Sequence, residues 1–347
     1  MASTPPRTHT LFETPSGLRI WAFEPPPAGF DPLRATEDEL FVHGYPPRPS
    51  HGLHRQLWEA AFRQDWTYVT PTFEIKETSR AYRQRFEGPQ AGPGGSTLSP
   101  NWSGGVVSAP TNTSIFCVTG QWNVPVVEPV SFDGSINSVY AWIGIDGIFG
   151  TNDVVQAGIA CDIRYVSPDG IAPKVVLKNY YPWFEWFNGN DPNRADPANV
   201  AVSISNLPIS PGDQVAGIIT IHSPTLAFVY LANGTTRKLT SFSFPPQINN
   251  PPDPAKGNTA EWIVERPGDG VGGLRTLPVY EPVVFNNALA TSRPIIVLPP
   301  NRRGNTVLDA GAGTSINMIK MIGSAASVVI AAGTLTGTYQ VTCTRVT

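Results

Sequence analysis

The stretch NTAEWIVERP, residues 258–267, sets the character of the whole chain. Side chains alternate across a β-strand, so the stretch divides into two faces, with Ala260, Trp262 and Val264 on one and Glu261, Ile263 and Glu265 on the other. The first face is apolar and predicts a strand packed against a hydrophobic core. The second face holds Glu261 between two large hydrophobic neighbours, where a carboxylate is usually disfavoured. That carboxylate makes the second face a candidate for function rather than for packing.

The composition favours β-structure with many turns. Of 347 residues, 36 are Pro and 32 are Gly, and both residue types divide a chain into short elements. The hydrophobic share of 41% is enough for a sizeable core, while the charged share of 15% is below the roughly 25% of an average soluble domain. A net charge of −3 gives no reason to expect nucleic acid or a membrane as partner. No apolar run of about 18 residues occurs, and the first residues lack the pattern of a secretory signal.

Short strand-like runs recur after residue 100, with turn residues between them. None of the stretches in this part has convincing helical periodicity over three turns. The runs are 101–109, 114–125, 138–147, 153–163, 174–187, 199–205, 213–222, 226–234, 259–265, 282–290, 327–335 and 338–346. About a dozen strands at such spacing predict an all-β fold, an antiparallel two-sheet β-sandwich of jelly-roll or concanavalin-like type.

The first 95 residues differ from the rest. They hold 10 of the 24 Lys and Arg residues and 11 of the 27 Asp and Glu residues, so this segment is rich in charge. The Gly- and Pro-rich segment 87–100 has the composition of a linker. We therefore divide the chain into a small helix-containing N-terminal segment, 1–95, and a β-sandwich domain, 96–347.

Two helices are predicted in the N-terminal segment. Thr36 and Glu39 have the spacing of a capping box, which predicts the start of a short helix. A second helix is predicted over 51–64. Its apolar stripe comprises Leu53, Leu57, Trp58, Ala61 and Phe62.

The cysteines and histidines offer little for catalysis. Cys117, Cys161 and Cys343 are odd in number, widely spaced and match no zinc or redox signature. They are interpreted as three buried or half-buried thiols, with one disulfide and one free thiol as the alternative. Only His222 of the five histidines lies beyond residue 55. This argues against a Ser-His-Asp or zinc-histidine site in the C-terminal part.

Four strands each carry one carboxylate or amide on a face that is otherwise rich in aromatic residues and glycine. These four residues are Asp146, Gln156, Glu185 and Glu261. The opposite faces of the same strands are apolar, so neighbouring strands would gather the four side chains in an aromatic-walled groove. Each residue alone has a plainer interpretation as a solvent-facing polar side chain. Asp146, which precedes Gly147, is locally typical of a turn.

These motifs resemble those of the glutamic peptidases, the eqolisins. The matching stretches are NWSGGVV, VTGQWNVP, AWIGIDG, VVQAGI, YYPWFEWF, TAEWIVE and PVVFNNALATS, in the family's order over residues 101–292. The resemblance implies two packed antiparallel sheets, with a catalytic Gln and a catalytic Glu on the concave face of one. It matches these to Gln156 and Glu261.

The resemblance also implies which residues surround that pair. The expected substrate-binding residues are Trp102, Trp142, Asp146 and Glu185, which match family positions, with Trp183 and Phe187 as further aromatic walls. One departure stands at Ala160, where family members often carry an acid. The nearest acid is Asp162, on the same face of the strand if no bulge intervenes. The network that tunes the catalytic pair therefore differs, and with it the optimum pH.

The implied chemistry is hydrolysis of a peptide bond without a metal or an organic cofactor. Glu261 would act as a base toward water and then as an acid toward the leaving amine, while Gln156 would donate a hydrogen bond to the oxyanion. Acidic neighbours of Glu261 predict activity at acidic pH. The expected partners are polypeptide substrates, and the expected state is a monomer. Family precursors usually begin with a secretory signal, which is not seen here, so no location is assigned.

The residues alone leave other possibilities open. A glycosidase on a jelly roll would use Glu185 and Glu261 as its carboxylate pair, and a non-catalytic sugar-binding sandwich would need only the aromatic side chains. The N-terminal segment 1–95 is either a pro-segment removed on activation or a permanent accessory subdomain. As a pro-segment it would pair basic residues with the carboxylates of the groove and release them as these protonate. Those basic residues are Arg80, Arg83 and Arg85.

Overall fold

The fold is seen in a computed structural model of the chain. It describes residues 9–14, 17–49, 52–76, 90–91, 97–131, 133–151, 153–166, 175–188, 200–246, 254–269, 273–295, 306–309, 316–323, 328–337 and 339–346. Within these ranges the chain is mostly β-structure, as the sequence predicts. The two helices of the described part are α1 (Glu37–Val42) and α2 (Gly52–Phe62).

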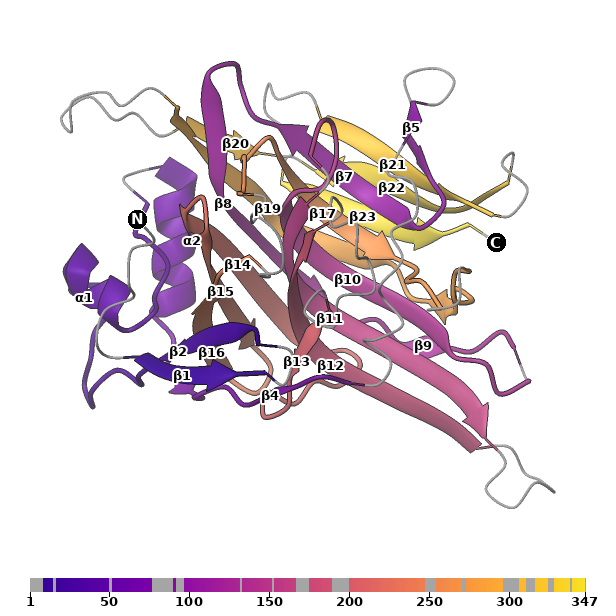
Figure 1. Cartoon of the computed structure of the whole chain (residues 1–347), viewed down its shortest axis with the longest axis horizontal. Helices are drawn as coiled ribbons and strands as arrows, with labels where there is room; N and C mark the ends of the chain where they lie inside the picture. Colours follow the sequence, from indigo (N-terminus) through magenta and orange to yellow (C-terminus); the bar gives the residue numbers. More distant parts are fainter. Residues whose placement is uncertain are drawn as a thin grey trace.

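The strands form two large sheets that pack face to face (Figure 1). The back sheet has the order β1–β2–β16–β15–β14–β8–β19–β20, with β3 beside β16. Its bounds are β1 His9–Glu13, β2 Arg19–Phe23, β3 Thr67–Tyr68, β8 Thr113–Asn123, β14 Gln214–Ser223, β15 Leu226–Asn233, β16 Lys238–Phe244, β19 Val283–Pro294 and β20 Thr306–Asp309.

The front sheet has the order β4–β13–β12–β11–β10–β17–β7–β21–β22–β23, with β6 beside β21 and β5 beside β6. Its bounds are β4 Phe73–Glu74, β5 Gln90–Ala91, β6 Thr97–Ser99, β7 Trp102–Ser108, β10 Asn137–Asp146, β11 Asp153–Val166, β12 Val175–Asn188, β13 Val202–Ile204, β17 Thr259–Glu265, β21 Ile316–Ile322, β22 Val329–Gly337 and β23 Gln340–Arg345. A separate two-stranded ribbon joins β9 (Val127–Glu128) to β18 (Val279–Tyr280).

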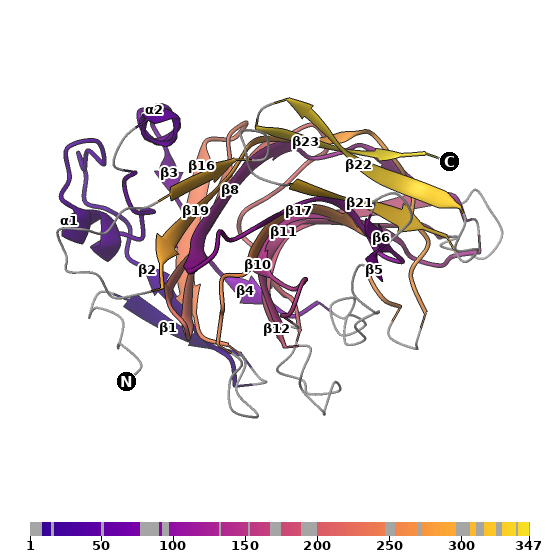
Figure 2. The ribbon, with the colours of Figure 1, turned by 90° about the horizontal axis from the view of Figure 1, so that it is seen from above.

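Neighbouring strands are antiparallel except in the pairs β16–β3 and β21–β6. Strand β19 belongs to both sheets, because its first residues pair with β23 and its later residues pair with β8. Figure 2 shows the front sheet curving, with its concave face turned away from the back sheet. The predicted antiparallel two-sheet sandwich is therefore confirmed.

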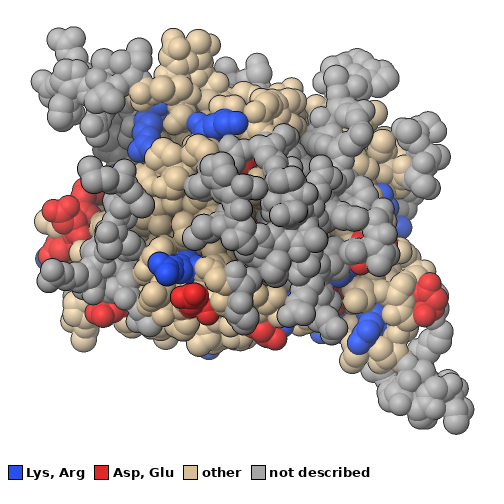
Figure 3. All heavy atoms as spheres, viewed as in Figure 1, with Lys and Arg blue, Asp and Glu red and all other residues tan. Residues whose placement is uncertain are grey.

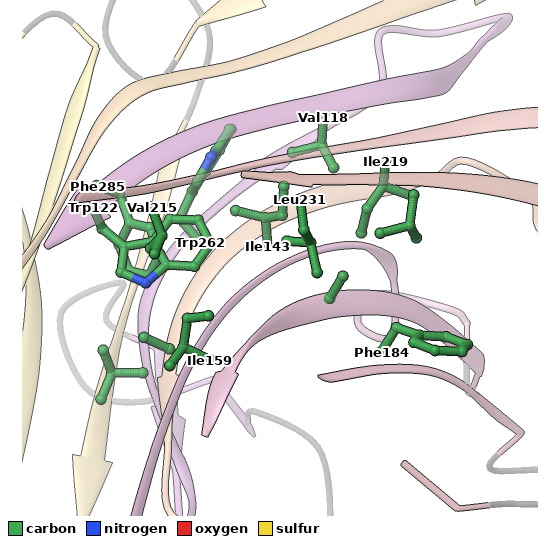
Figure 4. Close-up of a cluster of buried hydrophobic side chains, with 14 of the residues drawn as sticks. Val118, Trp122, Ile143, Ile159, Phe184, Val215, Ile219, Leu231, Trp262 and Phe285 are labelled. Carbon is green, nitrogen blue, oxygen red and sulfur yellow. The ribbon is translucent and has the colours of Figure 1, made fainter. Parts of the chain in front are cut away.

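The main core lies between the two sheets, and the stretch at 258–267 shows how it forms. Ala260, Trp262 and Val264 of β17 are fully buried in this core, as their alternation predicts. Figure 4 shows Trp262 among apolar side chains that point inward from both sheets. The indole N–H of Trp262 donates to the backbone carbonyl of Thr119 on β8 at 2.7 Å, so the polar end of the ring is satisfied across the core. The other face of β17 is consequently the concave face of the sandwich.

The N-terminal segment packs on the sandwich and extends it. Strand β2 pairs with β16 at the edge of the back sheet, and Leu18 and Ile20 are buried in the main core at 2% and 0% exposure. Strand β4 continues the front sheet beyond β13. The capping box of Thr36 and Glu39 is present at the start of α1, as predicted.

Helix α2 confirms the second predicted helix, but its buried stripe differs from the predicted one. His54, Trp58 and Phe62 face the sheet, whereas Leu53 is 37% exposed. The helix is turned so that the His54 ring meets the hydroxyl of Thr291, at 3.4 Å, on the outer face of the back sheet. Figure 2 shows α1 and α2 on the outer side of the back sheet, away from the concave face of the front sheet.

Other predictions have mixed outcomes. Strands β9, β16, β18, β20 and β21 are missing from the predicted runs after residue 100. The three cysteines are free thiols, which excludes the alternative of one disulfide. Arg80, Arg83, Arg85 and most of the linker 87–100 lie outside the described residues.

Neither described helix is long and apolar enough to cross a bilayer. On the face drawn in Figure 3, charged side chains are scattered among uncharged ones.

Candidate active site

Four strands of the front sheet place their functional residues in one row across the concave face. Gly144 of β10 pairs with Glu261 of β17 on one side and with Gln156 of β11 on the other. Gln156 in turn pairs with Glu185 of β12. Directly paired residues point to the same face of a sheet, so Glu261, Gly144, Gln156 and Glu185 form a central row. Because Gly144 has no side chain, Glu261 and Gln156 face each other across it, about 10 Å apart at their Cα atoms.

The ring of Trp142 borders the gap above Gly144. A Cβ atom added to Gly144 would lie 2.8 Å from Cζ3 of Trp142 and 3.2 Å from Cγ2 of Val154, so the position has no room for a side chain. Trp142 is fully buried, and its indole N–H donates to Oε2 of Glu265 at 2.8 Å. Trp102 meets the same ring edge-on, with centroids 5.1 Å apart. These contacts fix the indole beside the central row.

Gln156 and Glu185 form a buried hydrogen-bonded pair. Nε2 of Gln156 donates to Oε2 of Glu185 at 3.0 Å, and the two residues are only 3% and 1% exposed. Burial, together with the charge of Glu265, raises the pKa of Glu185 to about 8, against the opposing effect of the Gln156 hydrogen bond. Oε1 of each residue is buried and has no hydrogen-bond partner among the described residues.

Glu261 is an unpaired buried carboxylate. It is fully buried, and neither of its oxygens has a hydrogen-bond partner in the described part of the chain. Burial and the charge of Asp146 raise the pKa of Glu261 well above its ordinary value, while the nearby hydroxyl of Thr259 opposes the rise. Unsatisfied buried acids are rare in proteins and call for a functional explanation.

Asp146 is a turn residue whose carboxylate also binds the segment before β17. It ends β10 with φ at 71°, in the left-handed region, as expected for a residue in a turn. Its carboxylate accepts hydrogen bonds from the backbone N–H groups of Lys256 at 2.7 Å, Gly257 at 2.9 Å and Asn258 at 2.7 Å. It therefore holds the segment that leads into β17, and with it Glu261.

The aromatic residues expected around the pair all lie on the concave face. They belong to a second apolar cluster, distinct from the core between the sheets, which includes Trp102, Trp142, Trp183 and Phe187. All four are buried, the most exposed being Trp102 at 8%. The candidate substrate-binding residues therefore share one face with the central row.

Sequence reasoning did not select Glu265 as a site residue. Its carboxylate accepts hydrogen bonds from the indole of Trp142 and, at 3.1 Å, from the amide of Asn101. The signal was available, because Glu265 lies on the same face of the quoted strand as Glu261. It was missed because the amide comes from the residue before β7 and the indole from β10, both far away in sequence.

Asp162 does not replace the acid that family members carry at the position of Ala160. It lies on the same face as Gln156, as the parity predicts, but six residues and so about 20 Å further along the strand. It belongs to a separate buried network that stiffens that end of the sheet. Its oxygens accept hydrogen bonds from Ser138 at 2.6 Å, Tyr181 at 2.8 Å, Arg275 at 3.1 Å and Tyr140 at 3.4 Å.

Two other kinds of site find little support in the same geometry. Among the described residues, no three His, Cys, Asp or Glu side chains come together as metal ligands would. Glu185 and Glu261, the carboxylates that a glycosidase would use, are separated by two strands of the sheet, and Gln156 and Gly144 lie between them in the central row.

Comparison with known proteins gives one family. Residues 100–345 match the model of the peptidase A4 family. No curated protein matches the chain.

Several solved structures are similar to it. Scytalido-glutamic peptidase with a transition state analog inhibitor is 22% identical, with 72% of this chain and 99% of that one covered and a TM-score of 0.47. SCP-B, a member of the eqolisin family in complex with the tripeptide Ala-Ile-His, is 20% identical, with the same coverage and a TM-score of 0.44. Aspergilloglutamic peptidase from Aspergillus niger is 23% identical, with 60% and 99% covered and a TM-score of 0.41. Because these TM-scores are below 0.5, the family assignment rests on the match of residues 100–345.

Proposed function

The chain belongs to the peptidase A4 family of glutamic peptidases, and on that premise we propose that Glu261 and Gln156 are its catalytic pair. As a family member it is a hydrolase that acts on peptide bonds in polypeptide substrates. The observation that supports the pair most directly is the pairing of Gly144 with both residues. It leaves the two side chains on the same face of the strands on either side of β10, with a glycine between them in the row and the ring of Trp142 beside it.

In the proposed mechanism, the carboxylate of Glu261 takes a proton from a water molecule as its oxygen attacks the carbonyl carbon of the scissile bond. The electrons of the carbonyl move onto its oxygen, and the resulting oxyanion accepts a hydrogen bond from the amide of Gln156. Collapse of this intermediate breaks the C–N bond, while Glu261 returns its proton to the leaving nitrogen. One oxyanion donor contributes about 3–4 kcal/mol to the transition state.

The raised pKa of Glu261 decides the sign of the pH dependence. A general base must be ionised, so activity is lost as the pH falls through the pKa of Glu261. Burial raises that pKa above the ordinary value of 4.5, and the lower limit of activity moves upward with it. We therefore propose that activity begins at a higher pH than an ordinary glutamate base would give.

Two substitutions test the pair. Glu261→Gln preserves the shape of the side chain but removes the base, so nearly all hydrolysis of a denatured protein substrate should disappear while the thermal unfolding curve stays cooperative. Gln156→Ala should reduce kcat by about 10²–10³. Glu128→Gln, which changes an exposed surface carboxylate paired with Lys178, is the matched control and should leave kcat unchanged. Retention of more than about a tenth of wild-type activity by Glu261→Gln would refute the role of Glu261.

We further propose that residues 9–76 are a permanent accessory subdomain rather than a removable pro-segment. Leu18 and Ile20 are part of the main core, and removal of β2 would expose the edge of β16. The described helices cover the outer face of the back sheet and not the concave face. Neither property is expected of a pro-segment that covers the active-site groove and is removed on activation.

Incubation of the full chain at its optimum pH, followed by mass and by size-exclusion chromatography, tests this proposal. The N-terminal residues should stay with the sandwich, either in an uncut and active chain or as a fragment that co-elutes after a cut between about residues 80 and 101. A fragment that separates under native conditions while activity rises would overturn it.

A further inference from the structure

The hydrogen bond between Gln156 and Glu185 creates a conflict within the proposed mechanism. An amide nitrogen carries two N–H donors, and the one described here is engaged with a carboxylate oxygen of Glu185 at 3.0 Å. An oxyanion that forms on the other side of Gln156, toward Glu261, needs the same nitrogen, of which only the second N–H is then left to donate. While Glu185 is an acceptor, the amide is therefore held with its nitrogen toward Glu185.

Protonation of Glu185 reverses the direction of its hydrogen bond with Gln156. A protonated carboxyl carries an O–H donor, for which the amide oxygen of Gln156 is the suitable acceptor. A half-turn of the amide about its last side-chain bond exchanges the positions of its oxygen and nitrogen without moving the rest of the side chain. Both N–H groups then lie away from Glu185.

We propose that Glu185 is a positioning residue for Gln156, and that only its protonated form turns the amide nitrogen toward the gap above Gly144. This inference rests on the proposed catalytic pair. It assigns to Glu185 a role through Gln156 instead of the direct contact with substrate that the sequence suggests. The near-complete burial of both residues supports it, because a buried donor and acceptor must satisfy each other.

The surroundings of Glu185 favour its protonated form over a wide pH range. Burial and the negative charge of Glu265 raise its pKa to about 8. The other acid of the central row, Glu261, stands beyond Gly144. On the far side of β12, strand β13 pairs Val202 and Ser203 with the neighbours of Glu185, and neither of these titrates. Among the described residues, the paired neighbours of Glu185 in the sheet therefore include no Lys or Arg that would favour its ionised form.

The consequence is that activity should also fall at high pH, which gives the pH profile a second, upper limb. As the pH rises through the pKa of Glu185, the carboxyl ionises, the amide turns back, and the oxyanion loses its donor. Glu261 sets the lower limb and Glu185 the upper one, so kcat should follow a bell-shaped profile.

The test compares the pH profile of kcat for wild type, Glu185→Gln and Glu185→Leu on one quenched fluorescent peptide between pH 3 and 9. Glu185→Gln stays neutral and keeps an N–H donor for the oxygen of Gln156. It should retain kcat within about threefold at the wild-type optimum and should lose the upper limb. Glu185→Leu cannot orient the amide and should reduce kcat by about 10–100-fold at every pH. Glu265→Gln, which removes the neighbouring charge, should move the upper limb to lower pH.

Two outcomes would overturn the inference while leaving the catalytic pair intact. One is a Glu185→Gln variant that keeps the wild-type upper limb. The other is a Glu185→Gln variant that is as impaired as Glu185→Leu while both remain folded. A fully active Gln156→Ala variant would instead refute the catalytic pair itself, so the two failures are distinguishable.

Discussion

Substitution of Gly144 by alanine probes the gap between Glu261 and Gln156 without touching either residue. The added Cβ atom would stand 2.8 Å from Cζ3 of Trp142, whereas carbon atoms in contact are about 3.5–4.0 Å apart. The indole must therefore move by about 0.7–1.2 Å. It cannot swing freely, because Glu265 holds its N–H and Trp102 packs against its face.

The expected cost has two parts. Overpacking of a buried site typically lowers the free energy of unfolding by about 1–3 kcal/mol. A displacement of about 1 Å next to reacting groups lowers kcat by about 10²-fold. We therefore expect Gly144→Ala to fold, with a reduced melting temperature, and to lose about two orders of magnitude in kcat on a quenched fluorescent peptide.

Gly217→Ala is the matched control. Its Cβ atom would stand 3.1 Å from Cδ1 of Ile143, which lies on the opposite face of β10 in the main core. This variant should also lose stability but should keep kcat within about twofold. A folded Gly144→Ala variant with kcat within about threefold of wild type would show that the chemistry does not take place above Gly144.

Three further outcomes are expected. In the ion pair of Arg275 with Asp162 the two side chains are 5% and 6% exposed. Arg275→Leu removes the cation of this pair and should lower the free energy of unfolding, measured in urea, by about 3–5 kcal/mol. A loss below about 1 kcal/mol would mean that the remaining hydrogen-bond donors suffice for Asp162. Burial raises the pKa of Glu185, Glu261 and Asp146 above their unfolded values, so the folded state binds more protons and the melting temperature should fall from pH 4.5 to pH 8; a rise over this window contradicts the shifts. Chelation by EDTA should leave the activity unchanged, because neither proposed catalytic residue needs a metal, and inactivation that added zinc reverses would disprove this.

The face of each strand could be predicted from the sequence, but the register between strands could not. Alternation correctly puts Glu261, Gln156 and Glu185 on the concave side, because a period of two depends only on local residues. The position of Gly144 between Glu261 and Gln156 depends on how far each strand slides along its neighbour, which alternation leaves open. The central row is therefore a property of the fold.

Other differences have equally physical reasons. Strand β16 is not predicted because Ser241 and Ser243, which are small and polar, are nonetheless buried. The buried stripe of α2 depends on which residues of the sheet meet the helix, and Thr291 favours His54 over Leu53. Propensity and periodicity describe one element at a time, and these choices are made between elements.

The position of β2 has a consequence for how the chain must be made. Ala22 pairs with Phe242, 220 positions later in the sequence. During synthesis the first strands emerge from the ribosome long before their partners exist, and Leu18 and Ile20 stay exposed to water throughout that delay. Contacts of such separation also slow folding, because a large loop must close before any apolar surface is buried. Newly made chains should therefore depend on a chaperone that shields the amino-terminal apolar residues until β16 has been translated.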